Sequence, residues 1–217
     1  MEENFFLGKR QEMVREQLVK RGIADKRMLD AFLAVPRHQF VPEDKRRIAY
    51  DDSPVAIGEG QTISQPYMVA LMTQALDIEA GQRALEIGVG SGYQAAILAQ
   101  MGAKVFGVER VPALMEQALV VLKGLGFEMT LSLGDGTLGW TEFAPYDRII
   151  VSAAAPSIPA HLVEQLARPG KLVLPLGGPL QQSLTVIEKD AAGLVTQESL
   201  CSCIFVPLIG RFGYSER

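Results

Sequence analysis

A glycine-rich segment is the part of this 217-residue chain whose residue types are best suited to bind a small ligand. Leu85-Glu-Ile-Gly-Val-Gly-Ser-Gly-Tyr93 places glycines at positions 88, 90 and 92. Glycines at a strand-to-helix turn let the backbone turn sharply and approach a ligand closely. A dinucleotide-binding loop needs its third glycine at the position of Tyr93, and a P-loop needs a Gly-Lys-Ser/Thr sequence that this chain lacks. The spacing therefore favours a ligand without a pyrophosphate group.

Acidic residues accompany three successive predicted strands. Glu86 lies in the glycine-rich segment, Glu109 ends the second strand, and Asp135-Gly136 ends the third. A carboxylate after the second strand can accept hydrogen bonds from both ribose hydroxyls, and one after the third can meet an adenine amine. A ligand with an amino-acid group, a ribose, an adenine and no phosphate matches S-adenosylmethionine, whose product is S-adenosylhomocysteine. The alternative for Glu109 and Asp135 is that they are solvated surface acids. The predicted cofactor residues are Glu86, Gly88, Gly90, Ser91, Gly92, Glu109, Asp135 and Gly136.

Alternating strand and helix patterns from Gly81 onward would position these residues at one edge of a sheet. Helices are predicted over residues 93–101, 113–125 and 161–167, the last ended by Pro169-Gly170. Parallel strands need a crossover helix between them, so this alternation indicates a doubly wound, mostly parallel sheet. The last two strands have no helix between them, which indicates an antiparallel C-terminal edge. The seven predicted strands cover residues 84–87, 105–108, 129–133, 148–152, 172–176, 184–188 and 201–206.

Residues 1–80 differ in composition from the rest of the chain, with more charged residues and with apolar residues at helical spacing. Asp25 is the predicted N-cap of a helix over residues 26–35. An irregular segment, residues 57–64, precedes a helix that begins near Pro66 and continues over residues 67–76. We expect an N-terminal helical region with a substrate-site segment over 1–80, packed on an α/β cofactor-binding core over 81–217 as one compact unit. The predicted fold class is α/β, with a doubly wound, mostly parallel seven-stranded sheet.

Composition narrows the possible chemistry and partners. Lys and Arg number 21 against 25 Asp and Glu, so the net charge of -4 gives no reason to expect nucleic acid as a partner. Two histidines and two cysteines exclude a multi-His metal site, a Cys-rich zinc module and a disulfide scaffold, so no metal is expected. The longest uncharged runs are interrupted by glycine or proline, and the N-terminal sequence is unlike a signal peptide. We expect a cytoplasmic monomer that does not associate with membranes.

Several segments outside the glycine-rich loop carry a more specific signal. They are Val35-Pro-Arg-His-Gln-Phe-Val-Pro42, Ala49-Tyr-Asp-Asp-Ser-Pro54, Ile57-Gly-Glu-Gly-Gln-Thr-Ile-Ser-Gln-Pro66, Ala144-Pro-Tyr-Asp-Arg-Ile-Ile-Val-Ser-Ala-Ala-Ala-Pro156 and Phe205-Val-Pro-Leu208. With them the chain resembles the protein-L-isoaspartate O-methyltransferases of bacterial type, over about residues 9 to 210. Val89 is a small departure, since bacterial relatives often have threonine there.

The resemblance implies a fold, an activity and a set of substrate residues. The implied fold is the S-adenosylmethionine-dependent methyltransferase fold. The family transfers a methyl group from S-adenosylmethionine to the free α-carboxylate of L-isoaspartyl residues in damaged proteins and peptides. The methyl ester then re-forms a succinimide, and this starts repair. The resemblance puts the reactive-site serine at Ser64 and the substrate-binding residues at Thr62, Ile63, Ser64 and Pro66.

The implied reaction is consistent with the few catalytic side chains that the chain offers. An acceptor carboxylate is ionised at neutral pH, so it needs no general base. A cationic methyl donor and an anionic acceptor lose charge as they react, so a dry site favours the transition state. Ser64 would donate a hydrogen bond that orients the carboxylate; the alternative is that Ser64 only caps the helix that follows.

Three other functions stay open at this stage. An RNA methyltransferase of related fold would show a basic face and a pocket for a base, and the net charge is against it. A module that senses the cofactor without turnover would not need the Ser64 segment. A nicotinamide oxidoreductase would need glycine where Tyr93 stands.

Overall fold

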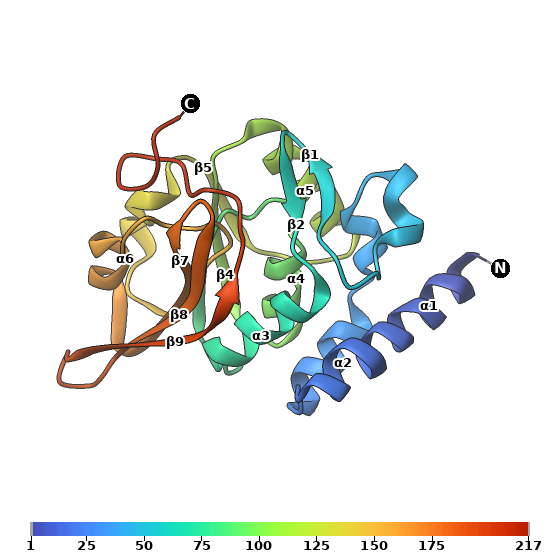
Figure 1. Cartoon of the computed structure of the whole chain (residues 1–217), viewed down its shortest axis with the longest axis horizontal. Helices are drawn as coiled ribbons and strands as arrows, with labels where there is room; N and C mark the ends of the chain where they lie inside the picture. Colours follow the sequence, from blue (N-terminus) through green and yellow to red (C-terminus); the bar gives the residue numbers. More distant parts are fainter. Residues whose placement is uncertain (1, 217) are drawn as a thin grey trace.

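A seven-stranded sheet with helices on both faces forms the centre of the computed structural model, which describes residues 2–216 (Figure 1). The strand order is β5-β4-β3-β6-β7-β8-β9. The strands are β3 (Arg83–Ile87), β4 (Lys104–Glu109), β5 (Thr130–Leu133), β6 (Tyr146–Val151), β7 (Leu166–Gly178), β8 (Gln181–Lys189) and β9 (Val195–Cys203). The helices that cover them are α3 (Pro66–Leu76), α4 (Tyr93–Gln100), α5 (Pro112–Gly124) and α6 (Ala160–Glu164).

Strand directions confirm the predicted fold class. The five strands from β5 to β7 pair in parallel, whereas β8 and β9 join the sheet antiparallel. Ile87 at the end of β3 pairs with Val108 of β4 and with Val151 of β6, so these strands end at one level. The segments that follow them therefore meet at the carboxyl edge of the sheet, where open α/β sheets bind ligands.

Alternation along the strands divides the apolar core between the two faces of the sheet. Leu85 and Ile149 belong to a buried cluster on one face, while Ala84 and Ile150 belong to a larger cluster on the other. Successive strand residues point to opposite faces, so a strand buried on both sides reads as a continuous apolar run. The larger cluster also contains apolar residues of the N-terminal region and of α3, α4 and α5.

Helices of the N-terminal region pack beside the sheet on the right of Figure 1. They are α1 (Glu2–Met13), which continues through a π-helical and a 3₁₀ turn to Arg21, and α2 (Lys26–Ala34). Asp25 caps α2 as predicted, because its carboxylate accepts a hydrogen bond from the Arg27 N–H at 2.8 Å. Two 3₁₀ helices follow, η3 (Arg37–Phe40) and η4 (Glu43–Ile48). Within residues 2–216, no helix combines the length and the apolar character that crossing a membrane requires.

Several predicted elements were wrong in kind or in extent. The fifth strand, predicted over residues 172–176, runs from Leu166 to Gly178. The segment predicted as irregular forms a small antiparallel hairpin of β1 (Val55–Gly58) and β2 (Gln61–Ile63), joined by a turn in which Glu59 has a φ of 51°. The helix predicted over residues 161–167 ends at Glu164 instead, and β7 begins at Leu166, before Pro169. The last strand lies at residues 195–203, earlier than the predicted 201–206.

Candidate active site

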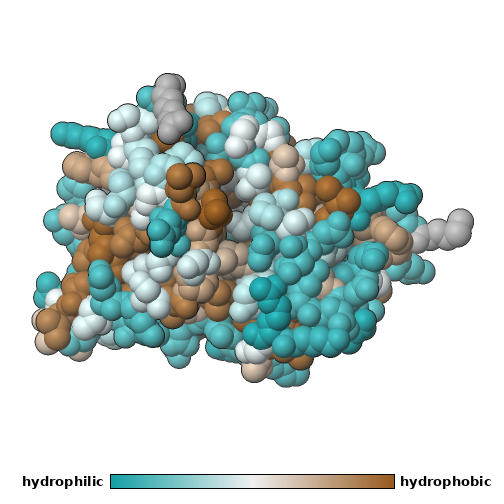
Figure 2. Space-filling view, in the orientation of Figure 1, coloured by the Kyte–Doolittle hydropathy of each residue, from teal (hydrophilic) through white to brown (hydrophobic). Residues whose placement is uncertain are grey.

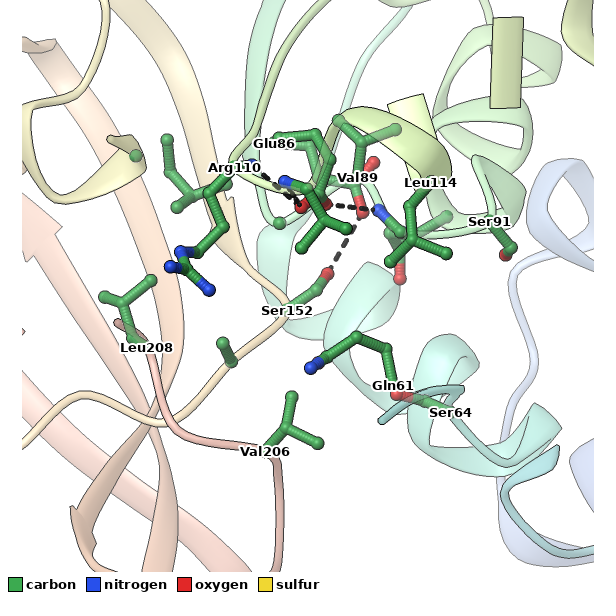
Figure 3. A pocket seen from close by; sticks show the side chains of 18 of the residues that line it. Gln61, Ser64, Glu86, Val89, Ser91, Arg110, Leu114, Ser152, Val206 and Leu208 are labelled. Carbon is green, nitrogen blue, oxygen red and sulfur yellow. Dashed lines mark hydrogen bonds between the residues drawn. The ribbon is translucent and has the colours of Figure 1, made fainter. Parts of the chain in front are cut away.

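One cavity lies at the carboxyl edge of β3, β4 and β6, and three distant parts of the chain form its walls (Figure 3). The glycine-rich segment and the ends of the strands form one wall, and the β2 segment forms the second. The third wall is the segment that follows β9. The residues that line the cavity include Gln61, Thr62, Ile63, Ser64, Glu86, Gly88, Gly90, Ser91, Tyr93, Glu109, Gly136, Ser152, Val206 and Leu208.

The glycine-rich loop has the backbone geometry that only glycine adopts readily. Gly88, Gly90 and Gly92 have φ values of 80°, 54° and 87°. A Cβ at Gly92 would also lie 3.0 Å from Leu122 Cδ1 of α5, so this glycine lets α4 pack against α5. Gly88 and Gly90 line the cavity, whereas Gly92 does not. Of the predicted loop residues, Gly92 therefore shapes the loop from outside the cavity.

Glu109 holds the glycine-rich loop in place with its carboxylate. One oxygen accepts from the Gly90 N–H at 2.8 Å, and the other accepts from the N–H groups of Arg110 at 2.7 Å and Val111 at 2.8 Å. Each carboxylate oxygen has two lone-pair sites, so the side chain retains acceptor capacity toward a ligand in the cavity. Glu109 thus lies at the cavity, where the sequence predicts it, and it also supports the glycine-rich loop.

Glu86 is a carboxyl group buried at the floor of the cavity. It is 1% exposed, and one oxygen accepts from the Ser152 hydroxyl at 3.0 Å, as Figure 3 shows. Its other oxygen, Oε2, is buried without a hydrogen-bond partner in the described chain. Burial raises the pKa of Glu86 well above its ordinary value, and the charge of Glu109 adds to this effect. An unpartnered acceptor beside an open cavity is suited to receive a donor from a ligand.

Asp135, like Gly92 and Pro66, is a predicted site residue that does not line the cavity. Its carboxylate accepts from the Thr137 N–H at 2.9 Å and hydroxyl at 2.6 Å, and from the Arg211 N–H at 2.7 Å. It lies instead beside a shallower hollow with Arg110 and Gly210, while its neighbour Gly136 does line the cavity. The direct contact between Asp135 and a cofactor remains a prediction.

The predicted acceptor segment enters the cavity from the β1–β2 hairpin. Thr62, Ile63 and Ser64 line the cavity, and Figure 3 shows Gln61 and Ser64 on the side opposite Arg110. Pro66 is buried as the first residue of α3 and does not line the cavity. The N-cap of α3 is Gln65, without a side-chain capping bond, so the alternative that Ser64 only caps this helix was wrong.

Some lining residues were not predicted as site residues. Ser152 follows β6, and the same strand-end logic that selected Glu109 would have found it. Gln61 precedes the quoted substrate motif, and Val206 and Leu208 belong to a segment noticed only through the family resemblance. The histidines lie elsewhere: His38 is buried, and its Nδ1 lies 2.8 Å from the Tyr50 hydroxyl.

The fold and the site together define the class of protein. A mostly parallel seven-stranded sheet with an antiparallel edge, a Gly-x-Gly-x-Gly loop after β3 and an acid at the end of β4 are the features of an S-adenosylmethionine-dependent methyltransferase.

Comparison with known proteins identifies the family. The sequence profile described as protein-L-isoaspartate(D-aspartate) O-methyltransferase matches residues 9–213, so the chain belongs to this family. The chain is 51% identical over 207 residues to protein-L-isoaspartate O-methyltransferase 2 of Geotalea uraniireducens, with 95% of each protein covered. It is 52% identical over 206 residues to protein-L-isoaspartate O-methyltransferase of Roseiflexus, with 94% of each covered.

Solved structures agree with this assignment. A protein-L-isoaspartate O-methyltransferase matches with a TM-score of 0.85 and 28% identity over 94% of this chain and 67% of that chain. A second, from Plasmodium falciparum, described as a complex with S-adenosyl-L-homocysteine, matches with a TM-score of 0.78 and 30% identity over 90% of this chain and 96% of that one. The family assignment favours the carboxyl methyltransferase prediction over the RNA alternative.

Proposed function

We propose that this protein transfers a methyl group from S-adenosylmethionine to the free α-carboxylate of L-isoaspartyl residues in damaged proteins and peptides. The observation that carries the proposal is one cavity in which the Thr62–Ser64 segment faces Glu86 and the glycine-rich loop. The acceptor segment and the cofactor loop come from different parts of the chain, and the fold brings them together.

The residues of the cavity fit the proposed cofactor. The positive charge of the amino group favours the ionised form of Glu86, whose unpartnered Oε2 then offers it an acceptor. Glu109 offers an acceptor to the ribose. When bound, S-adenosylmethionine supplies a methyl group attached to a sulfonium sulfur. The acceptor oxygen forms a bond to this methyl group while the C–S bond breaks, and the electron pair of the broken bond stays on sulfur.

The side chains of this protein then orient the acceptor and exclude water. Ser64 donates its hydroxyl hydrogen to the acceptor carboxylate and holds it against the methyl donor. Val206 and Leu208 supply apolar side chains to the wall that faces it. Holding both groups in line is worth on the order of 7 kcal/mol or more, which accounts for a site without a general base.

We also propose that the protein acts as a cytoplasmic monomer on proteins and peptides rather than on nucleic acid. The net charge of -4 supports a protein substrate over an anionic polymer. Light scattering on the purified protein measures the mass of the particle, and a dimeric mass would contradict the proposal of a monomer.

A labelling experiment tests the proposed activity. The purified protein receives S-adenosylmethionine with a radiolabelled methyl group and one of three matched peptides, containing L-isoAsp-Gly, L-Asp-Gly or D-Asp-Gly. We expect base-labile label on the isoaspartyl peptide and none on the L-aspartyl peptide. The D-aspartyl peptide measures tolerance of that isomer. No label on the isoaspartyl peptide, with label on RNA, would contradict the proposal.

A further inference from the structure

Arg37 is a buried cation that the proposed reaction does not explain. It begins η3, has no measurable exposure and is among the largest fully buried side chains. Within residues 2–216, no carboxylate forms an ion pair with it, and its Nη1 is buried without a hydrogen-bond partner. Burial lowers its pKa to about 10. An unpaired buried charge destabilises a fold, so packing alone would favour an apolar side chain at this position.

The contacts of Arg37 connect the two halves of the cavity. Its Nη2 donates to the carbonyl oxygen of Ser64 at 2.7 Å, and its Nε donates to the carbonyl oxygen of Ala49 at 2.6 Å. Its guanidinium carbon lies 4.8 Å from the centre of the Tyr93 ring. Ser64 and Tyr93 both line the cavity, and Tyr93 is the first residue of α4, directly after the glycine-rich loop.

These contacts fix the acceptor segment against the cofactor loop from behind. The carbonyl of Ser64 lies at the entry to α3, where the backbone leaves the β1–β2 hairpin and has no helical hydrogen bond to set its direction. A planar guanidinium with two donors on one edge holds two carbonyls in a fixed relation, which a lysine ammonium does not.

We propose that Arg37 is a positioning residue that sets the place of Ser64 relative to the methyl donor. The proposal rests on the proposed function, because it assigns to Arg37 the alignment of that reaction. Arg37 does not line the cavity, so it acts through the backbone of Ser64 and through the face of Tyr93. A shift of about 1 Å at a reacting group costs up to about 100-fold in rate, so a clamp on this backbone has a measurable effect on turnover.

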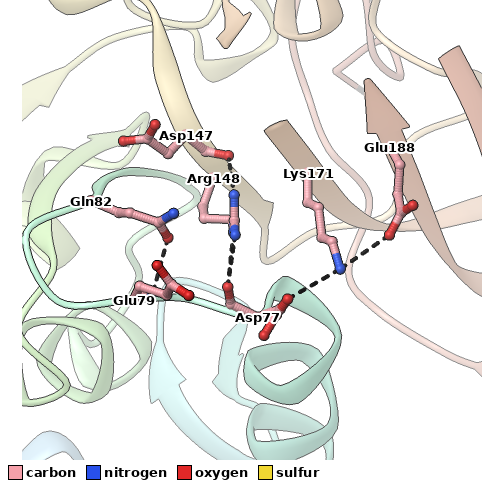
Figure 4. Close-up of polar contacts among 7 residues, drawn as sticks. All are labelled: Asp77, Glu79, Gln82, Asp147, Arg148, Lys171 and Glu188. Atoms are coloured by element: carbon pink, nitrogen blue, oxygen red, sulfur yellow. Dashed lines mark hydrogen bonds and ion pairs between the residues drawn. The ribbon is translucent and has the colours of Figure 1, made fainter. Parts of the chain in front are cut away.

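The chain contains a matched control at the other end of the same helix. Arg148 is 8% exposed, and its Nε and Nη2 donate to the carbonyl oxygen of Asp77 at 3.0 Å and 2.8 Å. Asp77 is the C-cap of α3, and Figure 4 shows it held by Arg148 and Lys171, with Glu188 beyond. Arg148 does not line the cavity. Both arginines therefore fasten α3 through backbone carbonyls, but only Arg37 does so at the reactive end.

The test compares Arg37→Met with Arg148→Met in the full-length protein. Each substitution leaves backbone carbonyl oxygens without their donors, and we expect this loss to lower the thermal stability of both variants. Arg37→Met lowers kcat/KM for the isoaspartyl peptide by about 10-fold or more, with the Kd for S-adenosylhomocysteine changed less than about twofold, while Arg148→Met keeps kcat/KM within about twofold. An equal loss of kcat/KM in both variants overturns the proposal, as does a loss in Arg37→Met that only follows weaker cofactor binding. If Arg37→Met does not fold, Arg37→Lys replaces it, and we expect the same loss of kcat/KM with the same cofactor Kd.

A double mutant separates positioning from general damage. If Arg37 acts through Ser64, adding Arg37→Met to Ser64→Ala lowers kcat/KM little further, whereas independent effects multiply. Multiplied effects overturn the proposal.

Amide hydrogen exchange over residues 61–69 tests the role of Arg37 without any measurement of activity. The proposed function is tested separately, by the turnover of the wild-type protein. Exchange in this segment speeds up in Arg37→Met and stays at the wild-type rate in Arg148→Met. Unchanged exchange in Arg37→Met overturns the proposal even if the wild-type protein methylates no isoaspartyl peptide.

Discussion

Ser64 is the residue on which the proposed chemistry depends most directly. Its segment lines the cavity opposite Ser152 and Glu86, and Gln65, not Ser64, is the N-cap of α3. We expect Ser64→Ala to lower kcat/KM for the isoaspartyl peptide by about 10-fold to 100-fold, because one oriented hydrogen bond to a charged group is lost. The Kd for S-adenosylhomocysteine, measured by calorimetry, stays near the wild-type value. A variant with full turnover would remove Ser64 from the reaction.

Glu86 links the cavity to the pH dependence of stability. Its pKa is raised in the folded protein above the ordinary value of 4.5, because burial disfavours the charged form and Glu109 adds a like charge. The folded state therefore holds this proton more tightly than the unfolded state does. The resulting stability is fully present below pH 4.5 and is lost as the pH rises through the raised pKa.

Replacing Glu86 by glutamine tests the direction of this pH dependence of stability. The amide keeps an acceptor for the Ser152 hydroxyl but cannot ionise, so Glu86→Gln removes the stability loss that accompanies ionisation. Without cofactor we expect the free energy of unfolding of the variant to exceed that of the wild type at alkaline pH, and the two to converge at acidic pH. Urea titrations over a pH series measure both. A wild type that gains stability relative to the variant as the pH rises would show that the folded protein holds Glu86 ionised, and this would contradict the raised pKa.

At the scale of elements, local pattern predicted the strands and helices whose apolar residues alternate or repeat. Residues 83–109 illustrate this, because β3, the glycine-rich loop, α4 and β4 lie within a residue or two of their predicted limits. Asp25 was found because a cap is a local hydrogen bond, here between residues two apart. Such features depend only on neighbouring residues, so the sequence displays them.

Contacts between distant residues account for the elements that were predicted wrongly. The helix before β7 ends early because the Gln165 carbonyl accepts from the Tyr146 N–H of β6 at 2.9 Å, and Lys189 Nζ binds the Val163 and Leu166 carbonyls. Arg37 shows no local sign of its task, since its partner Ser64 lies 27 residues away. Asp135 follows a strand end, and its carboxylate accepts from the Arg211 N–H, 76 residues later; its contact with the cofactor stays a prediction.

Asp135 holds the turn after β5 against the C-terminal segment. Burial tends to raise the pKa of this carboxyl, but hydrogen bonds from Arg211 and Thr137 together hold the pKa below its ordinary value. We expect Asp135→Ala to release the C-terminal segment and raise the Kd for S-adenosylhomocysteine, since the adjacent Gly136 lines the cavity. Calorimetry measures the Kd, and hydrogen exchange over residues 206–214 reports the release. Unchanged values of both would remove Asp135 from the site.

On the scale of the whole molecule, the site exists only when the N-terminal region, the central sheet and the C-terminal segment are in place together. Residues 61–64, the glycine-rich loop and residues 206–209 all line one cavity. A few side chains thus suffice for the proposed reaction, because the fold supplies alignment and exclusion of water where other enzymes use a base or a metal.

The shared core predicts that residues 1–80 and 81–217 unfold together. Tyr93 of α4 packs edge-on against Phe32 of α2 and Phe40 of η3, with ring centres 6.1 Å and 5.4 Å apart, and one buried cluster spans both regions. Trp140, the only tryptophan, contacts Phe106 and Phe143 in the cluster on the opposite face of the sheet, so its fluorescence reports on the 81–217 region. Far-UV circular dichroism reports on helices of both regions, including α1, α2 and α3.

We therefore expect the two signals to give one urea midpoint, as in a two-state transition. For the same reason, a fragment of residues 81–217 should bind a hydrophobic dye and unfold without a cooperative transition, since it exposes the apolar face that the N-terminal helices cover. Separate midpoints, together with a fragment that unfolds cooperatively, would mean that the two regions are independent domains. The acceptor segment would then be attached to the cofactor core only through the cavity and the Arg37 contacts.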